Sequence, residues 1–463
     1  MVGRRNVMAT QNGINRHILI IGAGFSGLAA AWQLSETVDQ DVSITLVDSR
    51  PYAGGRAFSF IDSNGLHHLD NGQHILLGCC NRFLEFLAAM GMPEAVRFQP
   101  LLRVPVYCQG RWSTISSLSL PGIFHLLPTL TNYRHLSFRE RLQMINMIRA
   151  LEENPNEMED ISFFEWLRMH GQSERSIHRL WDLVGVSVLN TRAEHASARQ
   201  AIRAFQTGII NGWKAARLGF FQVPLGDIGR QAVCALRKRD VTIRLNCPVQ
   251  SLIVRNDIVE GVKFKDGSHQ QADDIIAALP PDALLRVLPE NIRSISYFHE
   301  LHQLSWSPIV NVYLHFNRPI IKGDVIAFAE GVCQFLFNRG RLLGIAEEDG
   351  KLIGVSISAA DHLRQVTADN LIEMVIHELC SAVPEARDAT LISAKVVWQP
   401  QATFLQSVGT GAFRRSSQTP VKGLWLAGDW TDTGWPACLE GAVRSGESAA
   451  RAVSQSFFEE NGI

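Results

Sequence analysis

A glycine-rich turn near the start of the chain limits the possible folds more than any other feature. Residues 17–21 (HILII) form a short β-branched run, and residues 22–27 (GAGFSG) follow it directly. Residues 26–34 then carry three consecutive alanines, which favour a helix. In such a strand–turn–helix, the first glycine permits the tight turn, the second lets the backbone approach a pyrophosphate, and the third lets helix and strand pack closely. The pattern predicts a dinucleotide site at a helix N-terminus.

The residues after this turn complete a β-α-β unit. A second β-branched run, residues 42–47, ends at Asp48. A carboxylate at this position accepts hydrogen bonds from ribose hydroxyls. A structural glycine turn that binds no ligand is the alternative interpretation, and the acidic residue argues against it. We therefore expect a parallel sheet with a right-handed crossover, as in a Rossmann-type domain.

Composition and charge exclude several classes of protein. Of 463 residues, 46% are hydrophobic and 19% are charged, which is typical of a globular chain, and the net charge of -1 gives no field that favours nucleic acid. Eight cysteines without a CxxC pair argue against a zinc site or a disulfide scaffold and indicate a reducing compartment. Without a signal-peptide pattern or a run of about 20 apolar residues, we expect a cytoplasmic protein, or one peripheral to the inner face of the cytoplasmic membrane.

The sequence predicts two structural units. Residues 86–215 are expected to be mostly helical, and strand-like segments return from residue 241, including a returning parallel strand at 274–278 and a second sheet that contains 310–316 and 352–358. The nucleotide-binding domain is assigned to residues 16–85, 216–290 and 415–455. The substrate-binding domain, a mixture of helix and sheet, is assigned to residues 86–215 and 291–414.

Two further motifs narrow the class of dinucleotide-binding protein to which the chain could belong. Gly54-Gly55-Arg56 places an arginine behind two glycines, where a guanidinium contacts a phosphate or the flavin edge. Near the other end, residues 426–431 (LAGDWT) and 439–446 (LEGAVRSG) follow an apolar strand. This combination resembles the FAD-dependent amine oxidase and carotenoid or phytoene desaturase superfamily. The resemblance implies an FAD-binding fold of the type shared by amine oxidases and GDP-dissociation inhibitors, assembled from both ends of the chain.

The resemblance also implies which residues contact FAD. The C-terminal motif closes over the ribityl chain in that superfamily, and the helix N-terminus faces the pyrimidine end of the flavin, where its dipole stabilises a reduced, anionic ring. Glu440 and Arg444, one helical turn apart, are expected to form a structural ion pair. The predicted cofactor-binding residues are Gly22, Gly24, Phe25, Ser26, Gly27, Asp48, Ser49, Arg50, Gly55, Arg56, Gly72, Gln73, His74, Val249, Gly428, Asp429, Leu439 and Ala442.

Three segments resemble one branch of this superfamily. They are residues 69–74 (LDNGQH), 189–191 (LNT) and 428–436 (GDWTDTGWP). They are similar to the bacterial squalene-associated FAD desaturases, which are the hydroxysqualene dehydroxylases of hopanoid biosynthesis. The resemblance implies reduction of hydroxysqualene to squalene with loss of water, with a C30 isoprenoid as substrate and reduced FAD as the hydride source. It indicates neither the electron donor nor the oligomeric state.

An allylic alcohol loses water only when an acid protonates its hydroxyl, so the predicted catalytic residues are His74, Asp432 and Asp70, each near a flavin motif. Each also has a simpler interpretation: Asp70 caps a turn, His74 hydrogen-bonds the flavin, and Asp432 is a solvated loop carboxylate. His67 and His68, with Asp70 and His74, lack the spacing of a metal motif, and no metal is expected.

Residues 115–130 form an unusually apolar segment. Pro121 and Pro128 interrupt it, so it cannot be a straight helix that spans a membrane. It is either a buried helical hairpin or a membrane contact through which a hydrocarbon enters. In the second interpretation, the residues at the level of the lipid headgroups are Arg134, His135, Arg139 and Arg141.

Three other functions compete with dehydroxylation. A carotenoid-type desaturase that oxidises an isoprenoid hydrocarbon shares the fold, and nothing in the sequence excludes it. An amine oxidase is disfavoured because residues 398–420 lack a cysteine for a covalent flavin and residues 433–436 (TGWP) replace the usual aromatic pair. A non-redox prenyl-binding chaperone of the Rab GDP-dissociation-inhibitor type is disfavoured by the intact GAGFSG, Asp48 and GGR motifs.

Overall fold

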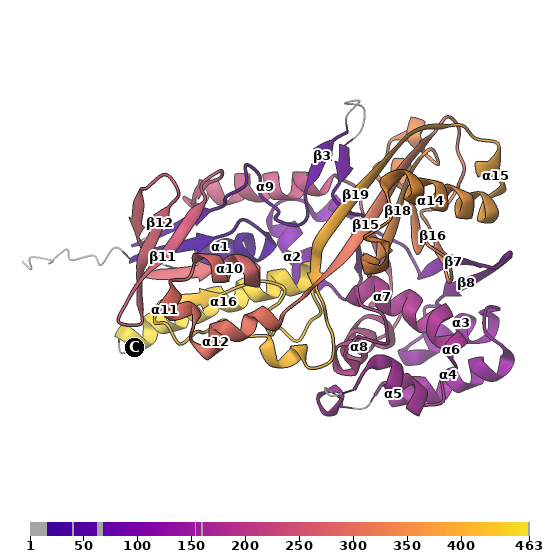
Figure 1. Cartoon of the computed structure of the whole chain (residues 1–463), viewed down its shortest axis with the longest axis horizontal. Coiled ribbons are helices and arrows are strands. Elements are labelled where there is room, and N and C mark those ends of the chain that lie inside the picture. Colours follow the sequence, from indigo (N-terminus) through magenta and orange to yellow (C-terminus); the bar gives the residue numbers. More distant parts are fainter. Residues whose placement is uncertain (1–15, 39–40, 63–67, 153, 159–160, 462–463) are drawn as a thin grey trace, which may run out of the picture.

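The computed structural model describes residues 16–38, 41–62, 68–152, 154–158 and 161–461 (Figure 1). A five-stranded parallel sheet forms the centre of the first unit. Its strands, in spatial order, are β10 (Thr242–Arg244), β2 (Val42–Val47), β1 (Arg16–Ile21), β14 (Asp274–Ala277) and β20 (Leu424–Leu426). Strands from the beginning, middle and end of the chain therefore share one sheet, and the predicted Rossmann-type α/β fold is confirmed.

Two helices from opposite ends of the chain lie side by side on this sheet. Helix α1 (Phe25–Thr37) follows β1, and α16 (Leu439–Asn461) follows β20. A Cβ atom added to Gly446 would lie 2.0 Å from the carbonyl oxygen of Ser26. Only glycine permits this approach, which explains the last residue of the C-terminal motif.

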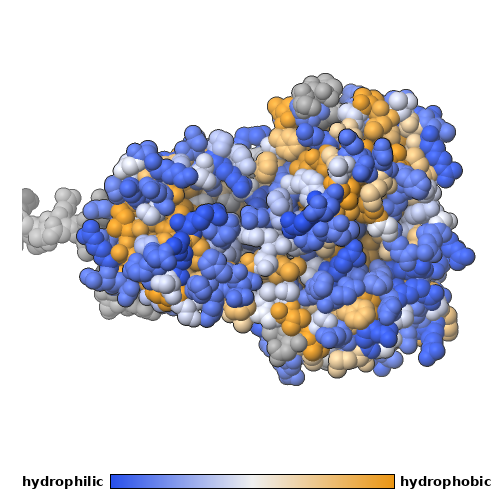
Figure 2. All heavy atoms as spheres, viewed as in Figure 1, coloured by the Kyte–Doolittle hydropathy of each residue, from blue (hydrophilic) through white to orange (hydrophobic). Residues whose placement is uncertain are grey.

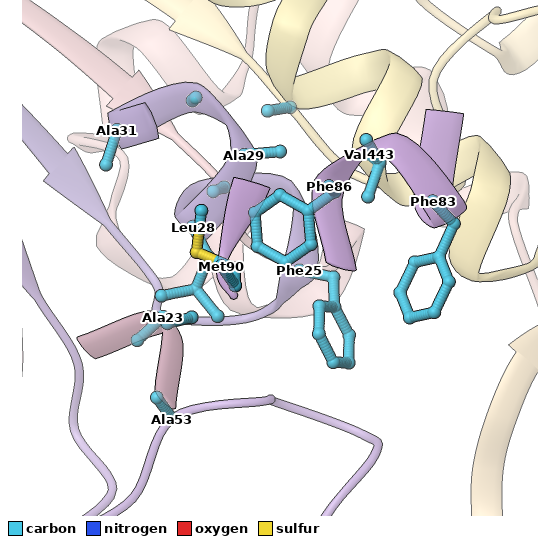
Figure 3. Packing of buried hydrophobic residues seen from close by; sticks show 14 of the residues in the cluster. Ala23, Phe25, Leu28, Ala29, Ala31, Ala53, Phe83, Phe86, Met90 and Val443 are labelled. Atoms are coloured by element: carbon cyan, nitrogen blue, oxygen red, sulfur yellow. The ribbon is translucent and has the colours of Figure 1, made fainter. Parts of the chain in front are cut away.

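Three phenylalanine rings meet in the hydrophobic core that these helices share with helix α2, which spans Asn81–Ala89 (Figure 3). Helix α2 places Phe83 and Phe86 against Phe25, with ring centroids 5.2 and 6.1 Å away and the rings edge to face. Val443 reaches the same core from α16. This packing fixes α2 against the start of α1 and of α16.

Glu440 is fully buried at the junction of α16 and α2. Its carboxylate accepts hydrogen bonds from the backbone N–H groups of Arg82 (3.2 Å) and Phe83 (2.8 Å), and it pairs with Arg444 at 2.7 Å. The predicted ion pair is present, and the same carboxylate also caps the N-terminus of α2.

A second core covers the other face of the parallel sheet. An antiparallel sheet contributes β11 (Val249–Arg255), β12 (Ile258–Phe264) and β13 (His269–Gln271). Short helices contribute α10 (Pro281–Val287), α11 (Glu290–Arg293) and α12 (Ser296–His299). Residues 291–304 were assigned to the substrate-binding domain, yet Ile292, Phe298 and Leu304 pack in this core. Residues 86–98 likewise pack in the core around α1.

The second unit is built on a seven-stranded mixed sheet. Its strands, in order, are β19 (Leu391–Phe404), β15 (Trp306–Phe316), β18 (Leu352–Ser358), β17 (Phe335–Asn338), β16 (Val325–Phe328), β7 (Arg103–Cys108) and β8 (Arg111–Ser116). Neighbouring strands are antiparallel except β16 and β7. Helix α14 (Ala368–Ala382) packs on one face, through Leu371, Val375 and Leu379.

A helical lobe lies beside this sheet (Figure 1). It contains α3 (Leu127–Asn132), α4 (Phe138–Ala150), α5 (Phe163–Met169), α6 (Glu174–Ser176), α7 (Leu183–Leu189) and α8 (Ala198–Phe205). Capping boxes begin α4 at Ser137 and α5 at Ser162. Helix α9 (Leu225–Arg237) packs against α1 in the first unit. The remaining elements are β3 (Ser59–Ile61), β4 (His68–Asp70), β5 (Ile75–Leu77), β6 (Val96–Phe98), β9 (Leu218–Phe221), α13 (Arg339–Leu342) and α15 (Pro384–Arg387).

The expectation that residues 86–215 are mostly helical was incomplete. The β7–β8 hairpin lies within that range and turns at Gln109 and Gly110, whose φ angles are +47° and +76°. Two positive φ angles are typical of the type I′ turn that matches the twist of paired strands. The predicted buried helical hairpin at 115–130 was also wrong, because the segment runs from the end of β8 through a 3-10 turn, η2 (Gly122–Leu126), into α3.

Hydrophilic residues cover most of the face shown in Figure 2, with hydrophobic residues interspersed. Within the described part of the chain, no helix combines the length and hydropathy needed to span a bilayer.

The close approach of α1 and α16 yields a stability prediction. In Gly446→Ala, the added methyl group collides with backbone, so the helices must separate, at a cost of about 1–3 kcal/mol in the free energy of unfolding. Denaturant titration followed by intrinsic fluorescence measures this loss. Gly323→Ala is the control, because no atom lies within 4 Å of its added Cβ. Equal stability of the two variants would contradict the packing argument.

Candidate functional site

One cavity of about 600 Å³ extends between the two units. Residues that directly follow β1 and β2, together with the GGR loop and the C-terminal motif, line one part, which we call the nucleotide arm. Residues from the helical lobe and the second sheet line the other part, which we call the apolar arm. The two arms meet near residues 72–74.

The predicted cofactor-binding residues converge on this cavity. Sixteen of the eighteen line it, and the exceptions are Gly27 and Val249. Gly27 serves packing, since an added Cβ would lie 1.9 Å from the carbonyl oxygen of Gly22. Val249 begins β11, two residues after Cys247, whose N–H donates to the carbonyl oxygen of Asp48 at 2.7 Å. A direct contact of either residue with a bound ligand remains a prediction.

Asp48 lines the nucleotide arm at the end of β2. One carboxylate oxygen accepts the N–H of Ala23 at 2.7 Å, and the other accepts the N–H of Arg50 at 2.8 Å. A carboxylate oxygen can accept two hydrogen bonds, so these contacts orient the group and leave capacity for ribose hydroxyls. The same contacts hold the GAGFSG turn against the end of β2.

The GGR loop packs directly on the GAGFSG turn. The N–H of Gly54 donates to the carbonyl oxygen of Ala23 at 2.8 Å, and a Cβ added to Gly55 would lie 3.0 Å from the Cα of Gly24. Gly55 also has a φ of +64°, which favours glycine. Arg56 pairs with Asp429 at 2.5 Å, so the GGR loop and the C-terminal motif meet at one ion pair.

Two helix N-termini face this arm. The start of α1 has no side-chain cap and no acidic residue in its first turn, and Gly24, Phe25 and Ser26 line the cavity. Leu439 and Ala442, in the first turn of α16, line it as well. Uncapped N–H groups and the positive end of the helix dipole suit a pyrophosphate and an anionic ring. The arm therefore fits a dinucleotide such as FAD.

A buried arginine that the sequence did not predict holds the C-terminal motif. The Arg414 guanidinium donates to the carbonyl oxygens of Thr431 (2.6 Å), Trp435 (2.7 Å) and Trp430 (3.2 Å). Burial lowers the pKa of Arg414. This residue precedes the motif by more than ten positions, so no local pattern identified it.

Asp70, predicted as a catalytic candidate, does not line the cavity. Its carboxylate is buried and accepts hydrogen bonds from Ser59 (2.6 Å), Leu225 (3.0 Å) and Arg339 (2.7 Å). Arg339 also donates to the Gln73 side chain at 2.8 Å. These contacts anchor the LDNGQH segment, so the structure supports a turn-stabilising role and contradicts an acid role for Asp70.

Asp432 also lies outside the cavity. Its side chain is exposed, and its carboxylate accepts only the N–H of Gly434, at 3.4 Å, among the residues that the structure describes. The loop bends away here because the carbonyl groups on either side are tied to Arg414. The prediction of Asp432 as a catalytic acid is therefore not supported.

His74 lines the cavity where the two arms meet. Its Nδ1 donates to the carbonyl oxygen of Gly72 at 3.0 Å, and Nε2 has no hydrogen-bond partner among the described residues. Burial lowers the pKa of His74, and the positive charges of Arg56 and Arg339 add to the effect, although Gly72 and Asp70 oppose it. A neutral imidazole with Nδ1 protonated presents Nε2 as an acceptor.

Asn311 is a second residue at this junction, and the sequence did not single it out. It lies on β15, is 1% exposed and lines the cavity. Its Oδ1 accepts the N–H of Gln73 at 3.2 Å, whereas its Nδ2 has no partner within the described part of the chain. A buried amide donor without a partner indicates a site that a ligand completes. The sequence signal that could have identified Asn311 is its position as a polar residue within a β-branched run, between Val310 and Val312.

The apolar arm carries aliphatic and aromatic side chains from both the helical lobe and the second sheet. They are Leu102, Val104, Ile115, Leu126, Met144, Ile148, Leu151, Leu180, Leu183, Val184, Phe205, Ile209, Leu218, Val325, Phe335 and Phe337. No carboxylate is among the described residues that line this arm. It fits a long hydrocarbon chain.

A metal-like grouping lies elsewhere. His178, Asp182 and Glu194 place their ligand atoms within 4.8 Å of one another, but His178 and Glu194 are exposed and Asp182 already accepts the Ala193 N–H. In the His67, His68, Asp70 and His74 group noted in the sequence, His67 lies outside the described residues. Asp70 is bonded to Arg339, and His74 to the carbonyl oxygen of Gly72.

These features define a flavoprotein oxidoreductase with an apolar substrate arm. The chain matches the family described as flavin-containing amine oxidoreductase over residues 25–454, and it belongs to that family. Its cofactor is FAD.

Curated relatives are similar over nearly the full length. A hydroxysqualene dehydroxylase of Sinorhizobium fredii is 26% identical over 94% of this chain and 97% of its own. A probable zeta-carotene desaturase of Synechococcus elongatus is 24% identical over 94% of this chain and 98% of its own. Among solved structures, an oxidoreductase of Methanosarcina mazei has a TM-score of 0.72 at 17% identity, and the match covers 95% of this chain and 100% of the oxidoreductase. A putrescine oxidase variant has a TM-score of 0.73 at 17% identity, and the match covers 95% of this chain and 99% of the oxidase. The structural likenesses bear on the fold alone.

The geometry around Asp48 predicts weaker cofactor binding in Asp48→Ala. Loss of a charged acceptor costs about 1.5–3 kcal/mol, which corresponds to a roughly 10- to 150-fold higher Kd for FAD. Reconstitution of apoprotein with FAD, followed by flavin fluorescence quenching, measures this change. Asp432→Ala is the matched control, since that carboxylate is exposed and outside the cavity. An unchanged Kd for Asp48→Ala would remove Asp48 from the site.

Proposed function

We propose that this protein is an FAD-dependent hydroxysqualene dehydroxylase, which reduces hydroxysqualene to squalene with loss of water. The observation that carries the proposal is the apolar arm, whose lining joins the nucleotide arm beside His74 and Asn311. A hydroxylated C30 hydrocarbon has a long apolar chain and one polar group. It matches a long apolar wall with polar side chains at one end.

The lining argues against an amine substrate. An ammonium group taken into an apolar cavity needs a carboxylate or another strong acceptor, because burial of an unpaired charge is costly. Arg203, on α8, is one of the residues that line the cavity, and its positive charge would repel an ammonium group. A neutral hydrocarbon alcohol meets no such penalty.

The curated relatives support an isoprenoid substrate class. The Sinorhizobium fredii relative is named a hydroxysqualene dehydroxylase, and several others are named zeta-carotene or phytoene desaturases. The C-terminal sequence GDWTDTGWP and the LDNGQH segment favour the dehydroxylase branch, because they resemble its motifs. Desaturation of an isoprenoid hydrocarbon is the second candidate, and the names of these relatives favour it.

The chemistry divides between cofactor and chain. Bound, reduced FAD supplies hydride. The chain must hold the hydroxyl group, deliver a proton to it as water leaves, and keep bulk water from the carbon centre. In this proposal the protonated form of His74 gives its Nε2 proton to the hydroxyl group, which leaves as water. The Asn311 amide donates a hydrogen bond to the same hydroxyl group, and the apolar wall excludes bulk water.

The lowered pKa of His74 gives the proposal a definite pH dependence. The ordinary pKa of histidine is about 6.5, and burial, with Arg56 and Arg339, places that of His74 below this value. The protonated, acidic form therefore grows only as the pH falls below about 6.5. If His74 delivers the proton, the rate rises toward acidic pH and declines as the pH rises through the lowered pKa.

The direct test is a single-turnover reaction. Photoreduced, anaerobic enzyme mixed with hydroxysqualene in detergent should yield squalene, with stoichiometric reoxidation of the flavin followed by absorbance. Gas chromatography identifies the product. Formation of a more unsaturated product from squalene by oxidised enzyme, with no dehydroxylation, would replace this proposal with the desaturase function.

The role of His74 is tested by a pH profile. His74→Gln should reduce the rate by about 100-fold or more and abolish the rise toward acidic pH, while flavin absorbance stays unchanged. His125→Gln is the matched control, because burial lowers the pKa of His125 as well but this residue does not line the cavity. A His74→Gln variant with a near-normal rate and profile would eliminate His74 as the proton donor.

A further inference from the structure

An unusual share of the exposed apolar surface lies on one short part of the chain. Eight of the fifteen large apolar side chains that the described residues leave exposed fall between Trp112 and Ile145. Leu118, Leu120 and Phe124 lie on the loop and the 3-10 turn that lead into α3, and Leu127 is the first residue of α3. Scattered apolar residues are normal on a protein surface, but such a concentration indicates an interaction site.

Helix α4 continues this surface. Phe138 is 71% exposed, Leu142 49% and Ile145 40%, at the i, i+4 and i+7 spacing that places them on one helix face. On its inner side, the same helix contributes Met144 and Ile148 to the apolar arm. A surface helix normally places polar residues opposite its buried stripe.

Helix α14 shows the normal arrangement in the same protein. It buries Leu371, Val375 and Leu379, and its exposed residues are mostly polar. Helix α4 is therefore apolar toward the cavity and toward the outside. A helix that is apolar on opposite faces is found where both faces are covered.

The two parts of the surface are adjacent. Helices α3 and α4 are in contact, and the Arg141 guanidinium donates to the carbonyl oxygen of Thr131 at the end of α3. Leu126 and Thr129, from the turn and from α3, line the apolar arm on the inner side. The surface formed by residues 118–127 and the outer face of α4, here called the apolar face, is thus the outer side of the cavity wall.

The charged residues in the segments that form the apolar face are mostly basic. Between residues 111 and 149 there are five arginines and a single acidic residue, Glu140. Glu140 is buried and pairs with Arg175 at 2.6 Å, whereas Arg134 and Arg139 are exposed. His135, predicted at headgroup level from the sequence, is instead buried, with Nε2 3.0 Å from the carbonyl oxygen of Val106.

We propose that the apolar face docks on a bilayer that contains anionic phospholipid, and that the hydrocarbon substrate passes from the bilayer into the apolar arm between the 118–127 segment and α4. Apolar side chains enter the acyl region, and the surrounding arginines contact the lipid phosphates. The passage of substrate rests on the proposed function; the docking does not. This surface differs from the predicted segment 115–130, because its most exposed apolar side chain, Phe138, lies on α4.

The test is vesicle flotation of the FAD-loaded protein. It should float with vesicles of phosphatidylcholine and phosphatidylglycerol, and less with phosphatidylcholine alone or at high salt. Phe138→Glu/Leu142→Glu should reduce the bound fraction about tenfold or more while leaving the flavin spectrum intact. Arg134→Gln/Arg139→Gln should weaken binding only to the anionic vesicles.

Met374→Glu/Ile392→Glu is the matched control, since these residues are 39% and 59% exposed in the second unit, away from α4. Equal loss in the control, or failure of the wild type to float, would overturn the docking. So would a dimer in size-exclusion chromatography that Phe138→Glu/Leu142→Glu converts to a monomer, because a second copy would then cover the face.

Turnover with detergent-solubilised and vesicle-embedded hydroxysqualene separates the two proposals. We expect the Phe138→Glu/Leu142→Glu variant to retain turnover in detergent and to lose it with vesicles. Flotation without dehydroxylation in either form would reject the proposed function and keep the docking. Equal turnover of wild type and variant with vesicles would reject the entry route.

Discussion

The contact between α1 and α16 is the constraint on which the rest of the structure depends. Gly446 brings the two helices within backbone distance at Ser26, near the N-terminal ends of both. Ser445, the preceding residue, accepts the N–H of Gly428 at 2.9 Å and bonds Thr431 at 2.6 Å. The same turn of α16 therefore fixes the N-terminal helix and the C-terminal motif. As a result, two helix dipoles, more than 400 residues apart in sequence, act on one cavity.

The nucleotide arm was nevertheless predictable from the sequence, because each of its motifs has a role that is set by local contacts. A glycine that permits close approach, or an aspartate at a strand end, has a role set by its neighbours in the chain. Sixteen of eighteen predicted residues consequently line the cavity. The parallel sheet, the strand at 274–277 and the last helix follow from the same periodicities.

The residues that the sequence misassigned depend on distant partners. Asp70 is near the flavin motifs in sequence, but Arg339, more than 260 residues later, takes its carboxylate. Asp432 lies within the most specific motif, yet Arg414 turns the loop so that this side chain faces outward. Asn311 lines the cavity only because the fold places β15 beside residues 72–74. Neither periodicity nor spacing carries such information.

The junction of the two arms is held by a buried network rather than by apolar packing. Arg339 from α13 pairs with Asp70, and the Tyr313 hydroxyl donates to the Asp70 carbonyl oxygen at 2.8 Å. Burial opposes the charge of Arg339, but the Asp70 carboxylate outweighs it and raises the pKa of the guanidinium. A buried ion pair contributes little net stability, although loss of one partner leaves an uncompensated charge. Its geometric consequence is larger: it fixes the LDNGQH segment of the first unit against the sheet of the second. His74 and Asn311 consequently meet at one point, where the apolar arm ends and the nucleotide arm begins.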